Sequence, residues 1–114
     1  EFADDINSLE EYSRDVWTIH QSASSRDLPG ESKNSAHPAA YPIGIPAGCI
    51  HHLTNECESV FDPFLGSGTT LIASEQLGRK CYGLEIDPSY CDVIVNRWEA
   101  FTGKTARRNE PKIA

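Results

Sequence analysis

The clearest pattern along the chain is an alternation of short apolar runs with helical periodicities. Residues 59–62 and 80–86 are apolar runs with β-branched and aromatic residues, and they predict two β-strands. The segment between them begins a helical pattern at Thr69 and ends it at Gly78, which is typical of a short helix. The order strand, helix, strand favours a parallel βαβ unit.

Two further helices are expected around this unit. A helix from Pro46 to about Asn55 is compatible with the sequence, because proline is accepted in a first helical turn. Asp87 and Pro88 predict the cap and start of a last helix, which ends at Gly103. The apolar positions of this last helix recur at helical spacing: Val93, Ile94, Trp98 and Phe101.

The flanking segments differ from this central region in character. Residues 1–36 combine an acidic lead-in, a short strand predicted at 15–20 and a loop rich in turn formers. Three prolines keep the backbone extended within residues 37–46. We therefore divide the chain into 1–36, a central region at 37–103, and a basic tail at 104–114 that we expect to be disordered.

Length and charge narrow the function classes. The 114 residues allow one small domain, and the formal net charge of -7 makes the body a poor nucleic-acid binder by itself. Only the tail after residue 103 is basic. No apolar run reaches the length of a membrane span, and the acidic start of the sequence does not resemble a signal peptide. We expect a cytoplasmic protein.

The cysteines and histidines predict no metal centre. Cys49, His51, His52 and Cys57 are near one another in sequence, but no CxxC pair is present, whereas structural zinc sites usually use such close pairs. Buried thiols and surface histidines in a reducing compartment explain these residues better.

The segment DPFLGSGTT at 62–70 carries the strongest chemical signal. Gly66 and Gly68 permit a tight turn and a close approach of ligand to backbone. A P-loop is excluded, because its second glycine and its lysine would fall on Leu71 and Ile72. A dinucleotide fingerprint lacks its third glycine, again at Leu71. S-adenosylmethionine remains as the candidate ligand, since it has no pyrophosphate and its binding loop needs fewer glycines.

Glu85 supports a ligand that contains adenosine. It follows Gly66 by 19 residues, near the end of the second predicted strand. A carboxylate at this spacing accepts hydrogen bonds from ribose hydroxyls in nucleotide-binding folds. A surface acid at a strand end is the alternative, and the glycine loop makes ribose binding the preferred interpretation.

These motifs together resemble the DNA amino-methyltransferases, which methylate the exocyclic amine of adenine or cytosine. HPAAYPIGIPAGCI resembles the segment before the first strand, DPFLGSGTT the cofactor loop, and GRKCYGLEIDPSYCDVIVNRW the region of the second strand. The DVWTI segment is also similar to what precedes the first motif. The resemblance implies an α/β fold: a partial Rossmann-like S-adenosylmethionine-dependent methyltransferase fold with a βαβα core and an incomplete sheet.

The resemblance also implies a cofactor site. Its residues are His37, Pro38, Asp62, Phe64, Leu65, Gly66, Ser67, Gly68, Thr69, Thr70, Glu85, Ile86 and Asp87. By this resemblance the first loop binds the methionine moiety, with Asp62 near its amino group and Phe64 lining the pocket. Thr69 and Thr70 cap the helix and bind the methionine carboxylate. Glu85 holds the ribose, and Ile86 and Asp87 lie beside the adenine.

Two of these residues have alternative roles, and one motif is missing. The resemblance implies that His37 and Pro38 close the other side of the site. The alternative role of His37 is to order the proline-rich loop, and the alternative role of Phe64 is to pack in the core.

The family's catalytic Asp-Pro-Pro-Tyr motif is absent. Asp87-Pro88-Ser89-Tyr90 is the nearest string, but it begins a helix behind the ribose acid, and we expect Asp87 to be a cap.

Three functional hypotheses follow. The first is the cofactor-binding portion of a DNA adenine-N6 or cytosine-N4 methyltransferase, inactive alone and dependent on DNA and on further chain. The second is a non-catalytic cofactor-binding or interaction module. The third, an NAD-binding fragment, is disfavoured by Leu71. Unless the strand at 15–20 covers it, one edge of the apolar strand at 59–62 is unpaired, which predicts a homo-oligomer or a catalytic partner chain.

Overall fold

The computed structural model describes residues 42–110. They form a βαβα unit preceded by a helix, in agreement with the order expected from the sequence. The elements are α1 (Gly44–Leu53), β1 (Ser59–Asp62), α2 (Thr69–Gln76), β2 (Lys80–Gly83) and α3 (Pro88–Thr102).

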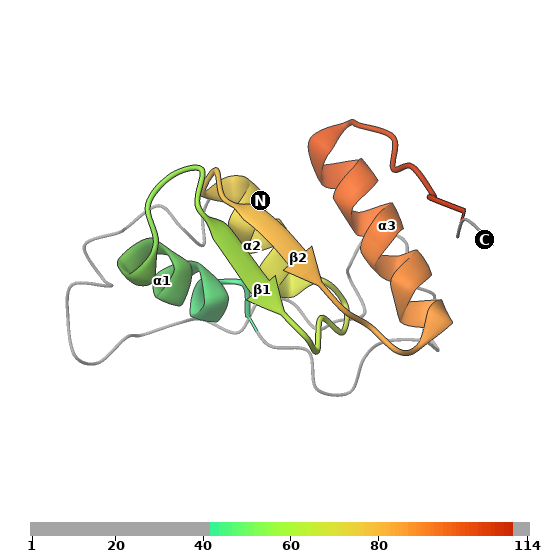
Figure 1. Cartoon of the computed structure of the whole chain (residues 1–114), viewed down its shortest axis with the longest axis horizontal. Helices are drawn as coiled ribbons and strands as arrows, with labels where there is room; N and C mark the ends of the chain where they lie inside the picture. The colour runs from blue at the N-terminus through green and yellow to red at the C-terminus, as the bar shows by residue number, and fades with distance from the viewer. Residues whose placement is uncertain (1–41, 111–114) are drawn as a thin grey trace.

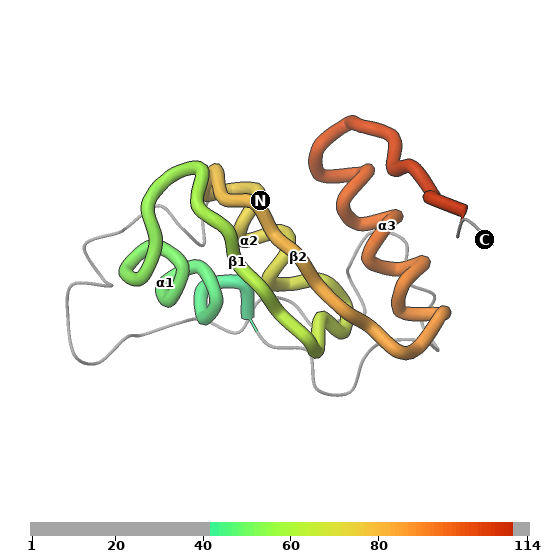
Figure 2. Tube along the Cα trace, in the orientation of Figure 1, coloured from blue at the N-terminus to red at the C-terminus, as the bar shows by residue number. Residues whose placement is uncertain are grey.

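Within the described residues, β1 and β2 form a two-stranded parallel sheet. Their register pairs Ser59 with Lys80 and Asp62 with Gly83. Because the strands are parallel, the connections that leave them, to α2 and to α3, lie at the same end of the sheet (Figures 1 and 2). This end is where open α/β sheets bind their ligands.

The bounds of α1 differ by two residues at each end from the expected helix at 46–55. The helix begins at Gly44, since Pro46 falls in the first turn, where a backbone N–H has no intrahelical acceptor. It ends at Leu53 because Thr54 is extended, and the Thr54 hydroxyl donates to the carbonyl oxygen of Ile50 at 2.6 Å. The prediction of a helix here is confirmed, and its exact bounds were wrong.

The second strand is shorter than the run at 80–86 that predicted it. β2 ends at Gly83 because its partner β1 ends at Asp62, where Pro63 has no N–H to continue the ladder. One further bond, from the N–H of Leu84 to the carbonyl oxygen of Asp62 at 3.0 Å, follows the last pair. Glu85 therefore lies in the loop after β2.

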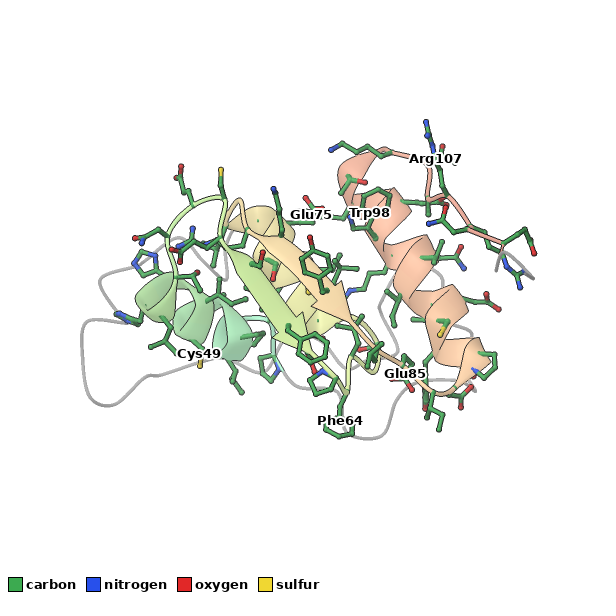
Figure 3. The ribbon with its side chains drawn as sticks, viewed as in Figure 1. Cys49, Phe64, Glu75, Glu85, Trp98 and Arg107 are labelled. Atoms are coloured by element: carbon green, nitrogen blue, oxygen red, sulfur yellow. The ribbon has the colours of Figure 1, made fainter. Side chains whose placement is uncertain are left out.

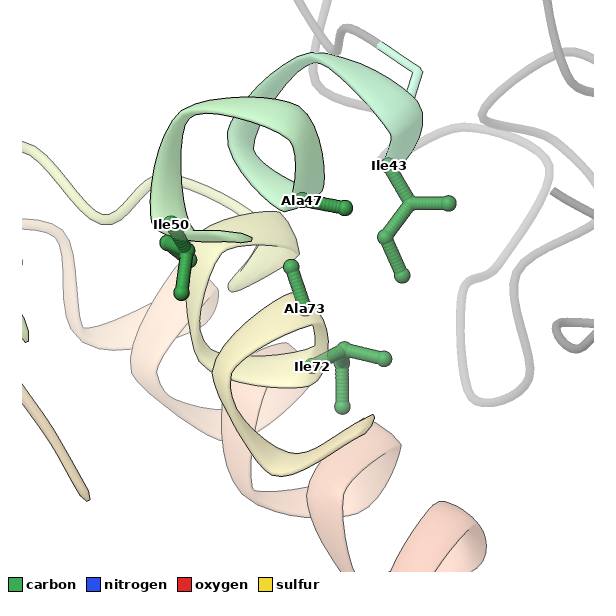
Figure 4. Packing of buried hydrophobic residues seen from close by; sticks show 5 residues of the cluster. All are labelled: Ile43, Ala47, Ile50, Ile72 and Ala73. Atoms are coloured by element: carbon green, nitrogen blue, oxygen red, sulfur yellow. The ribbon is translucent and has the colours of Figure 1, made fainter. Parts of the chain in front are cut away.

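The core lies between α1 and α2. Ile72 and Ala73 of α2 are almost inaccessible and pack against α1, as Figure 4 shows. Half-buried Trp98 and Phe101 of α3 pack against the same cluster, which confirms the apolar stripe expected for the last helix. The cluster of fully buried apolar residues comprises Ile43, Ala47, Ile50, Ile72 and Ala73. Truncating Ile72 to alanine is expected to cost about 2–5 kcal/mol.

Among the elements between residues 42 and 110, α2 covers one face of the sheet. α2 lies behind β1 and β2 in the view of Figure 1 and contacts the side that carries the half-buried Val60 and Cys81. The cross-strand neighbours Phe61 and Tyr82 point to the opposite side and are 64% and 60% exposed. Parallel sheets are usually covered on both faces, whereas no described helix buries this apolar pair.

The described range limits what can be compared with the sequence. The strand expected at 15–20, the loop at 21–36, His37 and Pro38 all lie outside it. Residues 103–110 contain no helix or strand, and the N–H of Ala106 donates to the Glu99 carboxylate at 2.7 Å. No helix within residues 42–110 is long and apolar enough to cross a membrane.

Candidate functional site

The loop after β1 is a tight turn with two glycines in the left-handed region. Gly66 has φ 58° and Gly68 has φ 88°, and the N–H of Gly68 donates to the carbonyl oxygen of Leu65 at 3.0 Å. At Gly68 a side chain would also collide with α3, because a Cβ there would lie 3.2 Å from Ile94. The turn therefore needs glycine for its dihedral angle and for its packing.

The structure corrects one detail of this turn. Gly68 is the N-cap of α2, whereas Thr69 and Thr70 are the first two residues of the helix. Both threonines are buried. The helix begins at Thr69, as expected, and the left-handed Gly68 occupies the cap position before it.

Asp62 connects β1 to both ends of the loop. One oxygen of its carboxylate accepts from the backbone N–H of Phe64 at 2.9 Å, and the other accepts from the Thr70 hydroxyl at 2.7 Å. The first bond shapes the turn around Pro63, and the second joins the strand end to the start of α2. Asp62 thus holds the loop closed across its base.

Glu85 connects the loop to the following strand. Its Oε2 accepts from the N–H of Gly66 at 2.7 Å, and its Oε1 accepts from the N–H of Asp87 at 3.1 Å. Next to it, the N–H of Leu65 donates to the carbonyl oxygen of Leu84 at 2.9 Å. A carboxylate has about four acceptor positions, so each Glu85 oxygen keeps capacity for a hydroxyl donor.

Asp87 is the N-cap of α3, as expected. Its side chain accepts from the N–H of Ser89 at 2.9 Å and from the Ser89 hydroxyl at 2.7 Å. The bond from the hydroxyl, followed by those from the backbone, lowers the pKa of the Asp87 carboxyl below its usual value. Pro88 occupies the start of the helix. This role in capping accounts for the Asp-Pro-Ser-Tyr string without catalysis.

Two exposed apolar side chains flank Glu85 from the two loops. Phe64 is 87% exposed and Ile86 is 97% exposed. Packing of Phe64 in the core, one of its two expected roles, is therefore wrong. Figure 3 shows Phe64 and Glu85 at the same end of the sheet. Exposed apolar side chains at this place are suited to contact the apolar part of a ligand.

Arg97 of α3 also contacts the loop, and the sequence did not single it out. It is 5% exposed, and its guanidinium donates to the carbonyl oxygen of Ser67 at 3.3 Å and to the Thr69 hydroxyl at 3.2 Å. Its position was a usable signal, because it follows Val93 by four residues and Ile94 by three on the apolar stripe.

The structure brings together the loop residues from 62 to 70 and the residues from 85 to 87, which belong to the two neighbouring strand ends. His37 and Pro38 lie outside the described residues. In that same part of the chain, residues 42–110, no three His, Cys, Asp or Glu side chains gather in a way that could hold a metal ion. The expected burial of the thiols is wrong for Cys49 and Cys57, which are both exposed.

Comparison with known proteins identifies the family. Residues 4–96 match a family model of N6 and N4 methylases described as DNA methylase. The chain is 34% identical over 98 residues to the type II methyltransferase M.ScaI of Streptomyces caespitosus, covering 82% of this chain and 31% of that protein. It is 33% identical over 89 residues to M.BglI of Bacillus subtilis, covering 78% and 26%. The chain thus spans about a third of the length of these relatives or less.

A solved structure has the same fold. It is a protein of Thermus thermophilus assigned as a DNA modification methylase and complexed with S-adenosyl-L-methionine. The TM-score is 0.61 at 24% identity, over 86% of this chain and 34% of that protein. The fold is thus a partial α/β Rossmann-like methyltransferase fold, as expected from the sequence. With a family model matched over most of its length, the chain belongs to the N6/N4 DNA methylase family.

Proposed function

We propose that this chain is the S-adenosylmethionine-binding portion of a DNA methyltransferase that acts on adenine N6 or cytosine N4. The observation that carries the proposal is the position of Glu85. Its carboxylate is fixed by the N–H groups of Gly66 and Asp87 at the carboxyl ends of two parallel strands. A ribose with two neighbouring hydroxyls suits a carboxylate held in this way.

In this proposal the residues around Glu85 bind the adenine and the methionine end of the ligand. The adenine lies beside the exposed side chain of Ile86 and beside Asp87, and the exposed Phe64 lines the pocket of the methionine moiety. The methionine end lies along the backbone of residues 65–68, with its amino group toward Asp62. The buried hydroxyls of Thr69 and Thr70 have partners inside the protein, so its carboxylate meets the N–H groups of the first turn of α2. His37 and Pro38 close the other side.

The chemistry of the complete enzyme needs residues from outside this chain. S-adenosylmethionine would supply an electrophilic methyl group, which the exocyclic amine nitrogen would accept with release of S-adenosylhomocysteine and of one amine proton to water. The residues that orient the flipped base belong to the Asp-Pro-Pro-Tyr motif, which this sequence lacks. We therefore propose that the chain alone transfers no methyl group and works in the cytoplasm with DNA and a catalytic partner.

The uncovered sheet supports the need for a partner. Phe61 and Tyr82 expose an apolar face, and the edge of β1 has no strand beside it within the described residues. We propose that a second copy or a catalytic chain completes the sheet. Sedimentation should give an assembly larger than a monomer, and a monomer at all concentrations would contradict an assembly of this chain with itself.

A second candidate function is a cofactor-binding module with no catalytic role of its own. The missing catalytic motif favours it for the isolated chain. Mixing the chain with its catalytic partner distinguishes the two candidates, because only a portion of an enzyme should restore transfer of a labelled methyl group to DNA.

Calorimetric titration tests cofactor binding directly. S-adenosylmethionine and S-adenosylhomocysteine should bind the 114-residue chain at one site, and NAD should not bind. Binding of NAD in preference would overturn the proposal in favour of a dinucleotide site. Methyl transfer to DNA by the chain alone would overturn the assignment of the catalytic residues to a partner.

A further inference from the structure

α3 contacts the glycine loop at two adjacent points. Ile94 lies behind Gly68, so close that a Cβ on this glycine would be 3.2 Å from its side chain. One turn further along α3, the Arg97 guanidinium binds the residues on both sides of the same glycine, at the Ser67 carbonyl and the Thr69 hydroxyl. The helix therefore supports the turn with an apolar contact and a charged contact.

The kind of side chain matters at this position. Arg97 lies among the apolar residues of α3 and is 5% exposed, where an aliphatic residue would ordinarily be found. Both bonds come from one nitrogen, Nη1, at the far end of the side chain, so the length of arginine and its charge bring one donor group to two acceptors. Lysine keeps the charge on a shorter side chain, and glutamine has neither the charge nor the reach.

We propose that Arg97 is a positioning residue of the cofactor site, an inference that rests on the proposed function. Its two bonds fix the turn at 67–69, and the turn sets the direction of the N–H groups at the start of α2. Its positive charge, together with the positive end of the α2 dipole, favours an anionic group in front of the turn. Arg97 thereby selects ligands with the carboxylate of an amino acid.

Arg79 provides a matched control. It is half-buried and also uses its guanidinium to bind threonine and backbone oxygens: the hydroxyl of Thr54 at 2.9 Å, the carbonyl of Thr54 at 2.7 Å and the carbonyl of Leu77. These contacts join the ends of α1 and α2 at the side of the sheet away from the loop. Arg79→Gln and Arg79→Lys therefore remove comparable bonds at the end of α2 that lies away from the glycine loop.

Amide hydrogen exchange on the full chain tests the positioning role without ligand. Arg97→Gln should raise the exchange rates of residues 66–71 at least tenfold, and Arg97→Lys should give an intermediate rise. The Arg79 variants should raise exchange near residues 54 and 77 and leave 66–71 unchanged. Unchanged exchange at 66–71 in folded Arg97→Lys would overturn the inference, and this milder variant decides the matter if Arg97→Gln does not fold.

Ligand binding tests the selection of the carboxylate. S-adenosylhomocysteine and methylthioadenosine share adenosine and a thioether, but only the former carries the amino-acid end. Arg97→Gln should lower the affinity for S-adenosylhomocysteine at least tenfold and the affinity for methylthioadenosine less than threefold. Equal weakening of both would overturn the selective role. If the unmodified chain binds neither ligand, the proposed function fails, while the exchange experiment still decides whether Arg97 positions the loop.

Discussion

The Glu85 carboxylate accepts a hydrogen bond of 2.7 Å from the backbone N–H of Gly66, 19 residues earlier in the chain. The bond joins the loops that follow the two parallel strands, so the acid expected to bind ribose also fixes the turn expected to bind methionine. A single side chain thereby couples the two halves of the candidate site.

Glu85→Gln should lower the affinity for S-adenosylhomocysteine about 10–100-fold, because hydrogen bonds to a charged acceptor contribute about 1.5–3 kcal/mol. Calorimetric titration measures the change. Glu58→Gln is the control, since Glu58 is an exposed acid that accepts from the N–H of Asn55 at 2.8 Å, before β1. Equal losses in both variants would assign the effect to net charge and contradict the role of Glu85.

Gly68→Ala should lower the free energy of unfolding more than Gly78→Ala. Both glycines have a positive φ, 88° and 74°, which costs a residue with a Cβ about 1–2 kcal/mol. Only at Gly68 does the new Cβ meet a neighbour, Ile94, which adds about 1–3 kcal/mol of overpacking. Urea denaturation measures both variants, and equal losses would show that Ile94 does not restrict the turn.

Protonation of Asp87 should destabilise the fold in acid. Because hydrogen bonds with Ser89 lower the pKa of Asp87 in the folded state, its contribution to stability is complete above the ordinary aspartate pKa. This contribution disappears as the pH falls through the lowered value.

Asp87→Asn isolates this effect, since asparagine also caps helices but does not titrate. Thermal unfolding between neutral and acidic pH should show a smaller decrease in Tm for Asp87→Asn than for the unmodified chain. Parallel decreases would mean that other carboxyl groups account for the acid sensitivity.

Cys81 should react slowly with thiol reagents. Burial, first of all, raises the pKa of its thiol, and the nearby carboxylates of Asp62 and Glu75 act in the same direction. Since the thiolate is the nucleophile, alkylation at mildly alkaline pH should modify the exposed Cys49 and Cys57 first. Peptide mapping of a time course checks the order, and equally fast labelling of Cys81 would indicate that β2 opens readily.

Local signals in the sequence predicted the order of elements in the described region. The two glycines of the loop have the positive φ that a tight turn requires, and Asp87 caps α3 as its place before Pro88 indicated. These features depend on the backbone preferences of a few adjacent residues. The roles assigned to individual site residues in ligand binding stay predictions.

Features that depend on contacts between distant segments were not predicted. The end of β2 depends on where β1 stops, and Phe64 is exposed in the loop after β1, away from the cluster between α1 and α2. The sequence did not indicate the role of Arg97, because a charged side chain on a helix ordinarily faces water. Only the packing of α3 against the loop makes Arg97 a buried donor.

A glycine outside the loop also determines its shape. At Gly83, the last residue of β2, a Cβ would lie 2.5 Å from the Leu65 side chain, which covers this position. A larger residue at 83 therefore forces the Leu65 side chain out of its present position. In a library randomised at both positions, folded variants with a side chain at 83 should carry a smaller residue at 65. The two sites would thus evolve as a pair, although 18 positions separate them.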